Sequence, residues 1–264
     1  MSQIASAQNP RLKALRRLHT KRERARSGLF LAEGEDLIAA AAQAGVAPLE
    51  GYRLAGAQLD AALHAHGFHE VERAALAGAS ALGSGSRVIA VYPQRWQRPA
   101  GPLCLYLHGV ADPGNVGAVL RSARAFGASC VALGPGCADP HSPKAVRASM
   151  GAIFTVALAR AAHVAELPGE RVALRADAPE PLRRALASGA RADAPGAAVT
   201  LLIGSERHGL PAGVLDACER SARIPIAGAS SAGVDSLNAA MAATVALYEL
   251  TRDTPPGEHR MPPA

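Results

Sequence analysis

The chain has 264 residues, 49% of them hydrophobic, which is enough for one large domain or two unequal ones with a buried core. Its net charge of +6 and pI of about 9.5 favour a polyanionic partner. The N-terminus lacks an apolar signal core, and no apolar run is long enough to span a membrane. The four cysteines form no C-x-x-C pair, so we expect neither a zinc site nor disulfides, and we expect a cytoplasmic protein.

The first 30 residues carry a net charge of +7, from eight basic side chains and one acid, Glu23. Asn9-Pro10 is typical of a helix start, leucines then recur at helical spacing, and Gly28 is the expected end of the helix. Such a helix fits contact with phosphates, although a merely solvated charged helix is the alternative reading. The side chains that we expect to contact phosphate are Arg11, Lys13, Arg16, Arg17, Lys21 and Arg22.

Residues 1–95 are predicted to form a small α/β domain. A strand is expected at 29–31, a helix at 34–44, and a further strand at 87–92. A segment rich in Pro and Gly follows at 96–102 and is the expected linker.

Residues 103–251 are predicted to form a second α/β domain. Its expected helices include 116–126 and 236–250, and its expected strands are 103–107, 130–133, 172–175, 199–203 and 222–226. Apolar strands that alternate with helices indicate a parallel sheet covered on both faces. Residues 252–264 are rich in Pro and polar residues and are expected to be a disordered tail.

Polar loops follow three of these strands, at the edge of the sheet where parallel α/β domains bind ligands. The first is Asp112-Pro113-Gly114-Asn115-Val116-Gly117, with Arg121 on the helix that follows. Backbone N–H groups at that helix start could hold an anion, although a capped helix with a surface arginine is the alternative.

The second loop, Gly204 to Leu210, places Glu206 between two glycines that would allow a ligand close to the backbone. The third begins with Ile224-Pro225-Ile226 and ends with Ser236-Leu237-Asn238 at the start of the last helix. The alternatives are a turn with a solvated glutamate and a helix capped by Ser236 with Asn238 in its first turn.

Taken together and in this order, the three loops resemble the motifs of the SpoU/TrmH branch of the SPOUT RNA methyltransferases. The patterns are D/N-P-x-N-x-G-x-x-x-R from Asp112 to Arg121, G-x-E-x-x-G-L from Gly204, and I-P-I with S-L-N from Ile224 to Asn238. The run from Asp139 to Gly151 is also similar to the family. Residues 9–35 resemble the substrate-binding domain that is fused to many members. The third loop is about four residues longer than usual, with 229–232 as the surplus, and His108 stands where Asp is common.

The resemblance implies a parallel α/β sheet with a C-terminal trefoil knot, a homodimer, and S-adenosylmethionine (AdoMet) as methyl donor, with no metal. It implies cofactor contacts from Gly204, Ile224 and Leu237. The residues that it assigns to the catalytic site are Asn115, Arg121, Glu206, Ser236 and Asn238. Because a guanidinium keeps its proton, we expect Arg121 to bind phosphate and stabilise the developing alkoxide.

The implied function is AdoMet-dependent methylation of a ribose 2′-hydroxyl in RNA, since only RNA carries that group. rRNA is the favoured substrate and tRNA is the alternative. A non-catalytic RNA-binding assembly factor is a further alternative, but it should have lost Asn115, Arg121 or Asn238. A dinucleotide-dependent oxidoreductase does not fit, because Asp139 follows Gly134-Pro135-Gly136 where a third glycine is needed.

Overall fold

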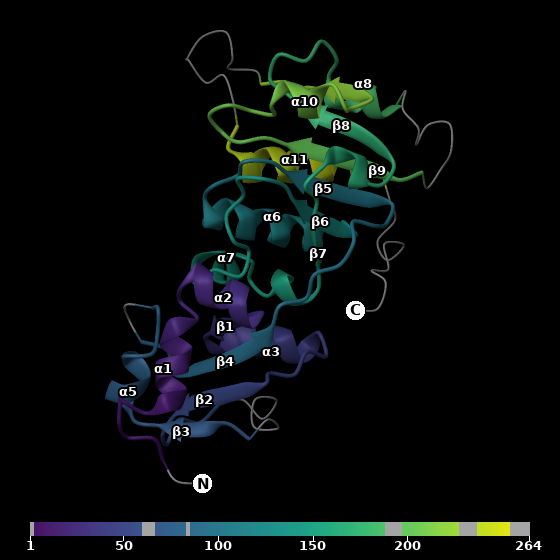
Figure 1. Ribbon diagram of the computed structural model, residues 1–264. Coiled ribbons are helices and arrows are strands. Elements are labelled where there is room, and N and C mark those ends of the chain that lie inside the picture. The colour runs from purple at the N-terminus through teal and green to yellow at the C-terminus, as the bar shows by residue number, and fades with distance from the viewer. Residues whose placement is uncertain (1–2, 60–66, 83–84, 188–196, 227–236, 254–264) are drawn as a thin grey trace. The chain divides into compact units, whose positions relative to one another are not determined.

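The computed structural model describes residues 3–59, 67–82, 85–187, 197–226 and 237–253. These residues contain two β-sheets with helices packed against them (Figure 1). The chain divides into two units. Unit 1 comprises Met1–Gln94 and Asp139–Thr155, and unit 2 comprises Arg95–Ala138 and Val156–Ala264. The segment Asp139–Thr155, which lies in the middle of the expected second domain, therefore belongs with the N-terminal residues. Residues 254–264, the main part of the expected tail, lie outside the described residues.

Unit 1 contains a four-stranded sheet in the order β1-β4-β2-β3. Strand β4 pairs antiparallel with β1 and β2, and β3 pairs parallel with β2. The strands are β1 (Leu29–Glu33), β2 (Glu50–Leu54), β3 (His69–Val71) and β4 (Val88–Pro93). The helices are α1 (Pro10–Arg17), α2 (Lys21–Ser27), α3 (Glu35–Gln43), α5 (Arg73–Ala77) and α7 (Pro143–Ala148), with a 3₁₀ turn η1 (Ala152–Phe154). One face of this sheet forms a core with the leucines of α1.

The single basic helix expected up to Gly28 is wrong, because α1 and α2 are separate helices. The Thr20 side chain accepts a hydrogen bond from the Glu23 N–H at 3.3 Å and starts α2 as its N-cap. Gly28 does end α2, in the left-handed conformation at φ +68°.

Unit 2 contains a six-stranded sheet in the order β10-β8-β9-β5-β6-β7, with every pair parallel as predicted. The strands are β5 (Leu103–Leu107), β6 (Cys130–Leu133), β7 (Ala157–Arg160), β8 (Glu170–Leu174), β9 (Val199–Ile203) and β10 (Arg220–Ala222). β7 was not predicted from the sequence, and the last strand was predicted at 222–226, whereas β10 ends at Ala222. Pro225 has no N–H for the ladder, so that segment leaves the sheet.

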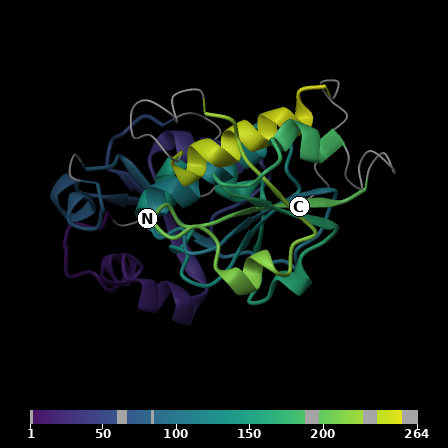
Figure 2. The same cartoon turned by 90° about the horizontal axis from the view of Figure 1, so that it is seen from above.

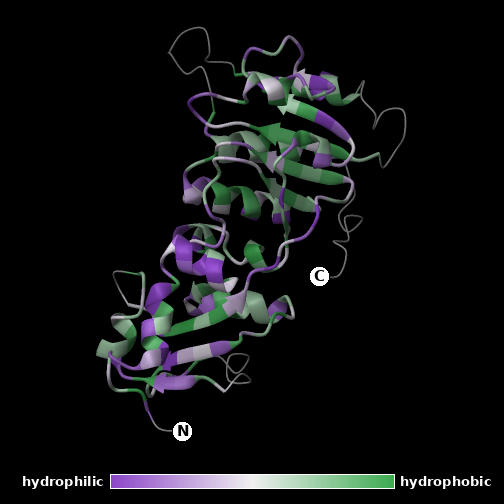
Figure 3. Cartoon of the chain, in the orientation of Figure 1, coloured by the Kyte–Doolittle hydropathy of each residue, from purple (hydrophilic) through white to green (hydrophobic). Residues whose placement is uncertain are grey.

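Helices cover both faces of this sheet, whose central strands are strongly hydrophobic (Figures 1, 2 and 3). On one face α6 (Pro113–Ala125) and α11 (Ala239–Thr251) lie side by side, joined by a hydrogen bond between the Ser122 and Thr244 hydroxyls at 2.6 Å. The other face packs against α10 (Ala212–Leu215) and the 3₁₀ turn η2 (Val164–Glu166). The short helix α8 (Leu182–Ala187) completes the described part of unit 2. This arrangement brings the loops after β5 and β9 to one edge of the sheet.

Candidate active site

The loop after β5 is fixed by a cap at the start of α6. Asp112 is the N-cap, and its side chain accepts a hydrogen bond from the Asn115 N–H at 3.1 Å. Pro113 occupies the first turn, where its missing N–H costs nothing. Helix α6 therefore begins three residues before the predicted Val116, and Asn115 lies in its first turn.

The loop after β9 is a tight turn. Main-chain hydrogen bonds join Ser205 and Gly209 in both directions, at 3.2 and 2.9 Å, and the His208 N–H donates to the Ser205 hydroxyl at 3.2 Å. Gly209 adopts φ +64°, and a Cβ on Gly204 would overlap the main chain of Gly209. These contacts hold the turn while leaving Glu206, Arg207 and His208 exposed.

Asn238 starts the last helix. It is the N-cap of α11 and accepts a hydrogen bond from the Ala240 N–H at 2.9 Å, so the helix begins later than the predicted 236. Its amide also donates to the Asn115 side-chain oxygen at 3.1 Å. Ser236, the other polar residue expected here, lies outside the described residues, as do 229–232.

Asn238, Asn115 and Glu206 form a directional chain of hydrogen bonds. Asn238 donates to Asn115, and the Asn115 amide donates to the Glu206 carboxylate. The three side chains come from three loops that are far apart in the sequence, and together they line a cavity of about 760 Å³ with Asp112. These hydrogen bonds fix the orientation of both side-chain amides and of the carboxylate. A site that positions a polar substrate needs side chains that are held in this way.

A second cavity of about 390 Å³ adjoins this chain. Its walls are mostly apolar, and they include all three residues expected to bind AdoMet, namely Gly204, Ile224 and Leu237. Within the described part of the chain, the main-chain groups of Ile224 and Leu237 make no hydrogen bond, so they are available to a ligand. The volume and the few polar groups suit a small, partly apolar molecule such as AdoMet.

Arg121 lies apart from these cavities. It is exposed on α6, and among the described residues its guanidinium forms no hydrogen bond or ion pair. It lines none of the described cavities. Its charge is therefore available to a bound anion rather than to the protein.

His108 follows β5 and lines a third cavity of about 430 Å³. Its Nδ1 lies 3.2 Å from the Tyr106 hydroxyl. Burial lowers the pKa of His108, and burial together with nearby Cys137 and Glu166 raises the pKa of Tyr106 to about 12. The histidine is partnered at the end of its strand.

The residues expected to contact phosphate are spread over α1 and α2. Arg11 pairs with His69, and Arg16 donates to the Ala7 carbonyl at 2.7 Å. The remaining four are exposed, namely Lys13, Arg17, Lys21 and Arg22.

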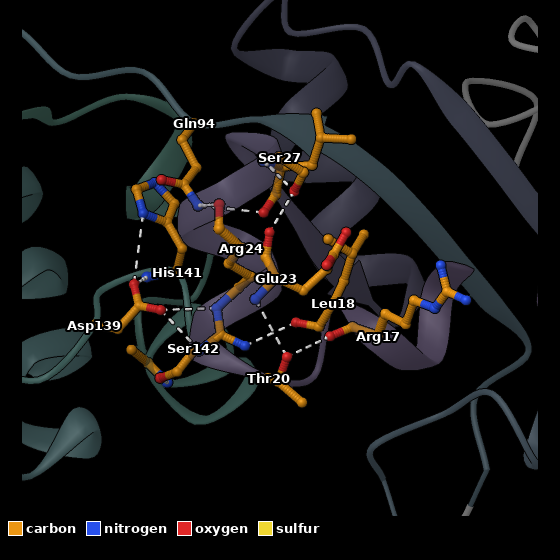
Figure 4. Close-up of polar contacts among 12 residues, drawn as sticks. Arg17, Leu18, Thr20, Glu23, Arg24, Ser27, Gln94, Asp139, His141 and Ser142 are labelled. Atoms are coloured by element: carbon orange, nitrogen blue, oxygen red, sulfur yellow. Dashed lines mark hydrogen bonds and ion pairs between the residues drawn. The ribbon is translucent and has the colours of Figure 1, made fainter. Parts of the chain in front are cut away.

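Arg24, in the same basic run, points into unit 1 instead (Figure 4). It is 3% exposed, and its guanidinium binds the Asp139 carboxylate at 2.7 Å and the Leu18 carbonyl at 2.7 Å. The burial of Arg24 could not be predicted from the run of basic residues, because its partner lies 115 residues away. It anchors the segment Asp139–Thr155 to α2.

Over the described ranges, no helix is long and apolar enough to cross a membrane. The same ranges contain no cluster of three or more His, Cys, Asp or Glu side chains arranged to hold a metal ion.

Comparison with known proteins identifies both parts of the chain. The SpoU rRNA Methylase family profile matches residues 102–248, more than half of the chain, and the MRM3-like substrate binding domain profile matches residues 9–90. This chain belongs to the SpoU rRNA methylase family. The predicted family is thereby confirmed.

Individual relatives match along almost the whole chain. The 23S rRNA (guanosine(2553)-2′-O)-methyltransferase RlmP of Bacillus subtilis is 28% identical over 95% of this chain and 99% of its own length. An uncharacterised tRNA/rRNA methyltransferase of Synechocystis, slr1673, is 32% identical over 96% and 94%. The AdoMet-bound rRNA methyltransferase of Sinorhizobium meliloti superposes with a TM-score of 0.80, at 28% identity, covering 96% of this chain and 98% of the other.

Proposed function

We propose that this SpoU-family chain transfers a methyl group from AdoMet to a ribose 2′-hydroxyl of rRNA. The observation that carries the proposal is the Asn238–Asn115–Glu206 chain of hydrogen bonds, which joins the three family loops beside the apolar cavity. Relatives that match the whole chain are named as rRNA methyltransferases, and one of them is named for 2′-O-methylation.

AdoMet would bind in the cavity of about 390 Å³, with Gly204, Ile224 and Leu237 as contacts, largely through their main-chain groups. When bound, it supplies a methyl group already activated by a positively charged sulfur. The protein then has to position the hydroxyl and lower the cost of removing its proton.

Arg121 would act as a fixed cation. It would bind the phosphate beside the target ribose and stabilise the negative charge that develops on the ribose oxygen. Asn115, Glu206 and Asn238 would orient the ribose and hold the loops together, and Ser236 would join them. A guanidinium is charged at neutral pH, so we do not assign it the proton.

The exposed basic side chains of α1 and α2 would contact RNA phosphates. They fall within residues 9–90, the part that matches a substrate-binding domain. Their contacts with phosphate should make RNA affinity fall as salt rises. Arg24 is buried and has no part in that surface.

The active form would be a homodimer with the family's trefoil knot, in the cytoplasm. The exposed face of helix α11 favours a dimer interface. Met241, Val245 and Tyr248 are exposed at helical spacing and form an apolar stripe on that face. The knot is proposed from family membership. Light scattering should give about twice the chain mass of 27.0 kDa, and an active monomer would refute the dimer.

Calorimetry with AdoMet and transfer of labelled methyl to purified RNAs test this function. We expect saturable AdoMet binding and label in rRNA, in the presence of EDTA. Label in tRNA alone would replace the substrate, and RNA binding without AdoMet binding would identify a non-catalytic factor instead.

A further inference from the structure

Three cavities of unit 2 meet at the turn after β9. One is the apolar cavity that contains Gly204, the second is lined by Asn115, Glu206 and Asn238, and the third is lined by His108. Ser205 and His208 line all three. A side chain at this position can face a methyl donor in the first cavity and a ribose in the second.

The cavity of the hydrogen-bonded chain offers few groups that can take a proton near neutral pH. Its acids are Asp112, which caps α6, and Glu206, which accepts the Asn115 amide. Carboxylates ordinarily titrate near pH 4, whereas an imidazole titrates near pH 6.5 and is a far better base at neutral pH. Arg207 lines the same cavity but has no free lone pair. His208 is the remaining titratable group among the described lining residues.

We propose that His208 is the general base that accepts the proton of the ribose 2′-hydroxyl, an inference that rests on the proposed function. In this step the hydroxyl O–H bond breaks and its proton passes to the unprotonated ring nitrogen of His208. The ribose oxygen forms a bond to the methyl carbon as the bond from that carbon to sulfur breaks, and that electron pair stays on sulfur. The imidazolium then releases its proton to water.

The local structure suits a base. The His208 N–H is held by the Ser205 hydroxyl at 3.2 Å, and the Ser205–Gly209 main-chain pair fixes the turn, so the ring extends from a rigid backbone. The ring itself is exposed to the cavities and can exchange its proton with solvent. Preorganised placement of this kind is what an efficient proton acceptor needs.

The charged and titratable groups around His208 come from several elements. The turn itself supplies Glu206 and Arg207, and the loop after β5 supplies Asp112. His108 lines the third cavity, and Arg175 and Asp177 line the first, where they form an ion pair with each other at 2.5 Å. Charged groups of both signs thus line the same cavities as His208.

The test compares wild type with His208→Asn, which keeps a polar side chain but cannot take the proton. We expect the single-turnover methylation rate to fall by roughly 10²–10⁴-fold, and the acidic limb of the pH–rate profile to disappear. Because His208 also lines the apolar cavity, the rates are compared at saturating AdoMet, with the AdoMet affinity of each variant measured by calorimetry. Added imidazole should partly restore the rate of His208→Ala. The matched control is His163→Asn, an exposed histidine that precedes η2 and lines none of the three cavities, and this variant should behave as wild type.

A second readout does not depend on turnover. NMR of the imidazole carbons should give a titration midpoint for His208, assigned by its loss in the Asn variant, that equals the kinetic midpoint of wild type. If His208→Asn keeps its acidic limb and loses less than about threefold in rate, the inference is overturned, while the proposed function stands. If wild type binds AdoMet but methylates no RNA, the proposed function itself has failed.

Discussion

At the scale of single residues, Asn115 has the most connections in the site. Its backbone N–H is held by the Asp112 cap, its amide donates to Glu206, and its side-chain oxygen accepts from Asn238. A side-chain amide carries both an N–H donor and a carbonyl acceptor, on separate atoms. The geometry therefore explains why an asparagine stands at this point of the first loop.

Arg121→Ala should lower the rate of methyl transfer by about 10²–10³-fold, because one preorganised charge is lost from the transition state. Its AdoMet affinity should remain near that of wild type, because Arg121 lies outside the apolar cavity. Single-turnover kinetics and calorimetry check this. The control is Arg124→Ala, an exposed arginine one turn later on the same helix. If the two variants behave alike, Arg121 is an ordinary surface residue.

Glu219 gives a pH dependence to the stability of unit 2. Its carboxylate accepts hydrogen bonds from the Arg171 main chain and guanidinium, which lower the pKa of Glu219 to about 2. A lowered pKa stabilises the folded state above the unfolded value of about 4.3, and that stabilisation is lost as the pH falls toward 2. Because the pair is partly exposed, Glu219→Gln should lower the melting temperature at pH 7 by only about 1–3 °C.

Thermal unfolding between pH 7 and pH 3 provides the measurement. The difference between Glu219→Gln and wild type should shrink once the pH drops below about 4. Asp216→Asn, at an exposed carboxylate without an ion pair among the described residues, is the control. A difference that is constant with pH would mean that the ion pair is not its source.

At the scale of elements, hydrophobic patterning predicted strands more reliably than it predicted helix boundaries. β5, β6 and β9 have the predicted bounds, since each is a mainly apolar run buried on both faces. The break between α1 and α2 was missed because the run of basic residues continues across it, although Thr20 and Glu23 have the spacing of a helix cap. β7 was missed because its sequence, ALAR, has little β-propensity and is placed by pairing with β6.

Arg24 should contribute much more to stability than the basic residues around it. Arg24→Met would leave the Asp139 carboxylate, at 15% side-chain exposure, without its partner, and removing one member of a buried pair typically costs about 3–5 kcal/mol. Urea unfolding followed by circular dichroism checks this, with the exposed Arg22→Met as the matched control at less than about 0.5 kcal/mol. Equal effects of the two substitutions would show that the Arg24–Asp139 pair does not hold the segment.

At the scale of the whole molecule, the segment Asp139–Thr155 determines where the chain can be cut without exposing apolar side chains. It lies between two strands of the catalytic sheet, yet its aromatic and apolar side chains pack in unit 1. The Phe154 ring lies 4.8 Å from Tyr92, and the His141 ring lies 4.8 Å from Phe30. A cut in the expected linker at 96–102 would therefore remove the partners of this segment.

A chain that begins near residue 99 should consequently be unstable. We expect strong binding of a hydrophobic dye and a lower melting temperature than that of the full chain, because the apolar side chains of η1 lose their cover. Replacing residues 140–154 in that chain by a short Gly-Ser linker should reduce dye binding. A well-folded truncated chain that binds no dye would contradict this account.

Of the residues that the resemblance assigned to the catalytic site, Asn115, Glu206 and Asn238 are joined by hydrogen bonds, whereas Arg121 lines none of the described cavities. These residues could be assigned to one site from the sequence because the three loops, each at a strand-to-helix junction, resemble the motifs of one family. The order of their hydrogen bonds depends on the Asn238 cap and on the closure of the turn at Ser205 and Gly209. Arg24 escaped notice because its burial depends on a contact across 115 residues.

Identifying the RNA atom that receives the methyl group tests the proposed 2′-O-methylation. Purified protein, AdoMet and unmodified rRNA would be incubated, and the RNA digested to nucleosides for mass spectrometry. We expect one new nucleoside with the methyl group on the ribose 2′-oxygen, made by wild type and greatly reduced with Arg121→Ala. A methyl group on a base, or no methyl transfer by protein that binds both AdoMet and rRNA, would contradict it.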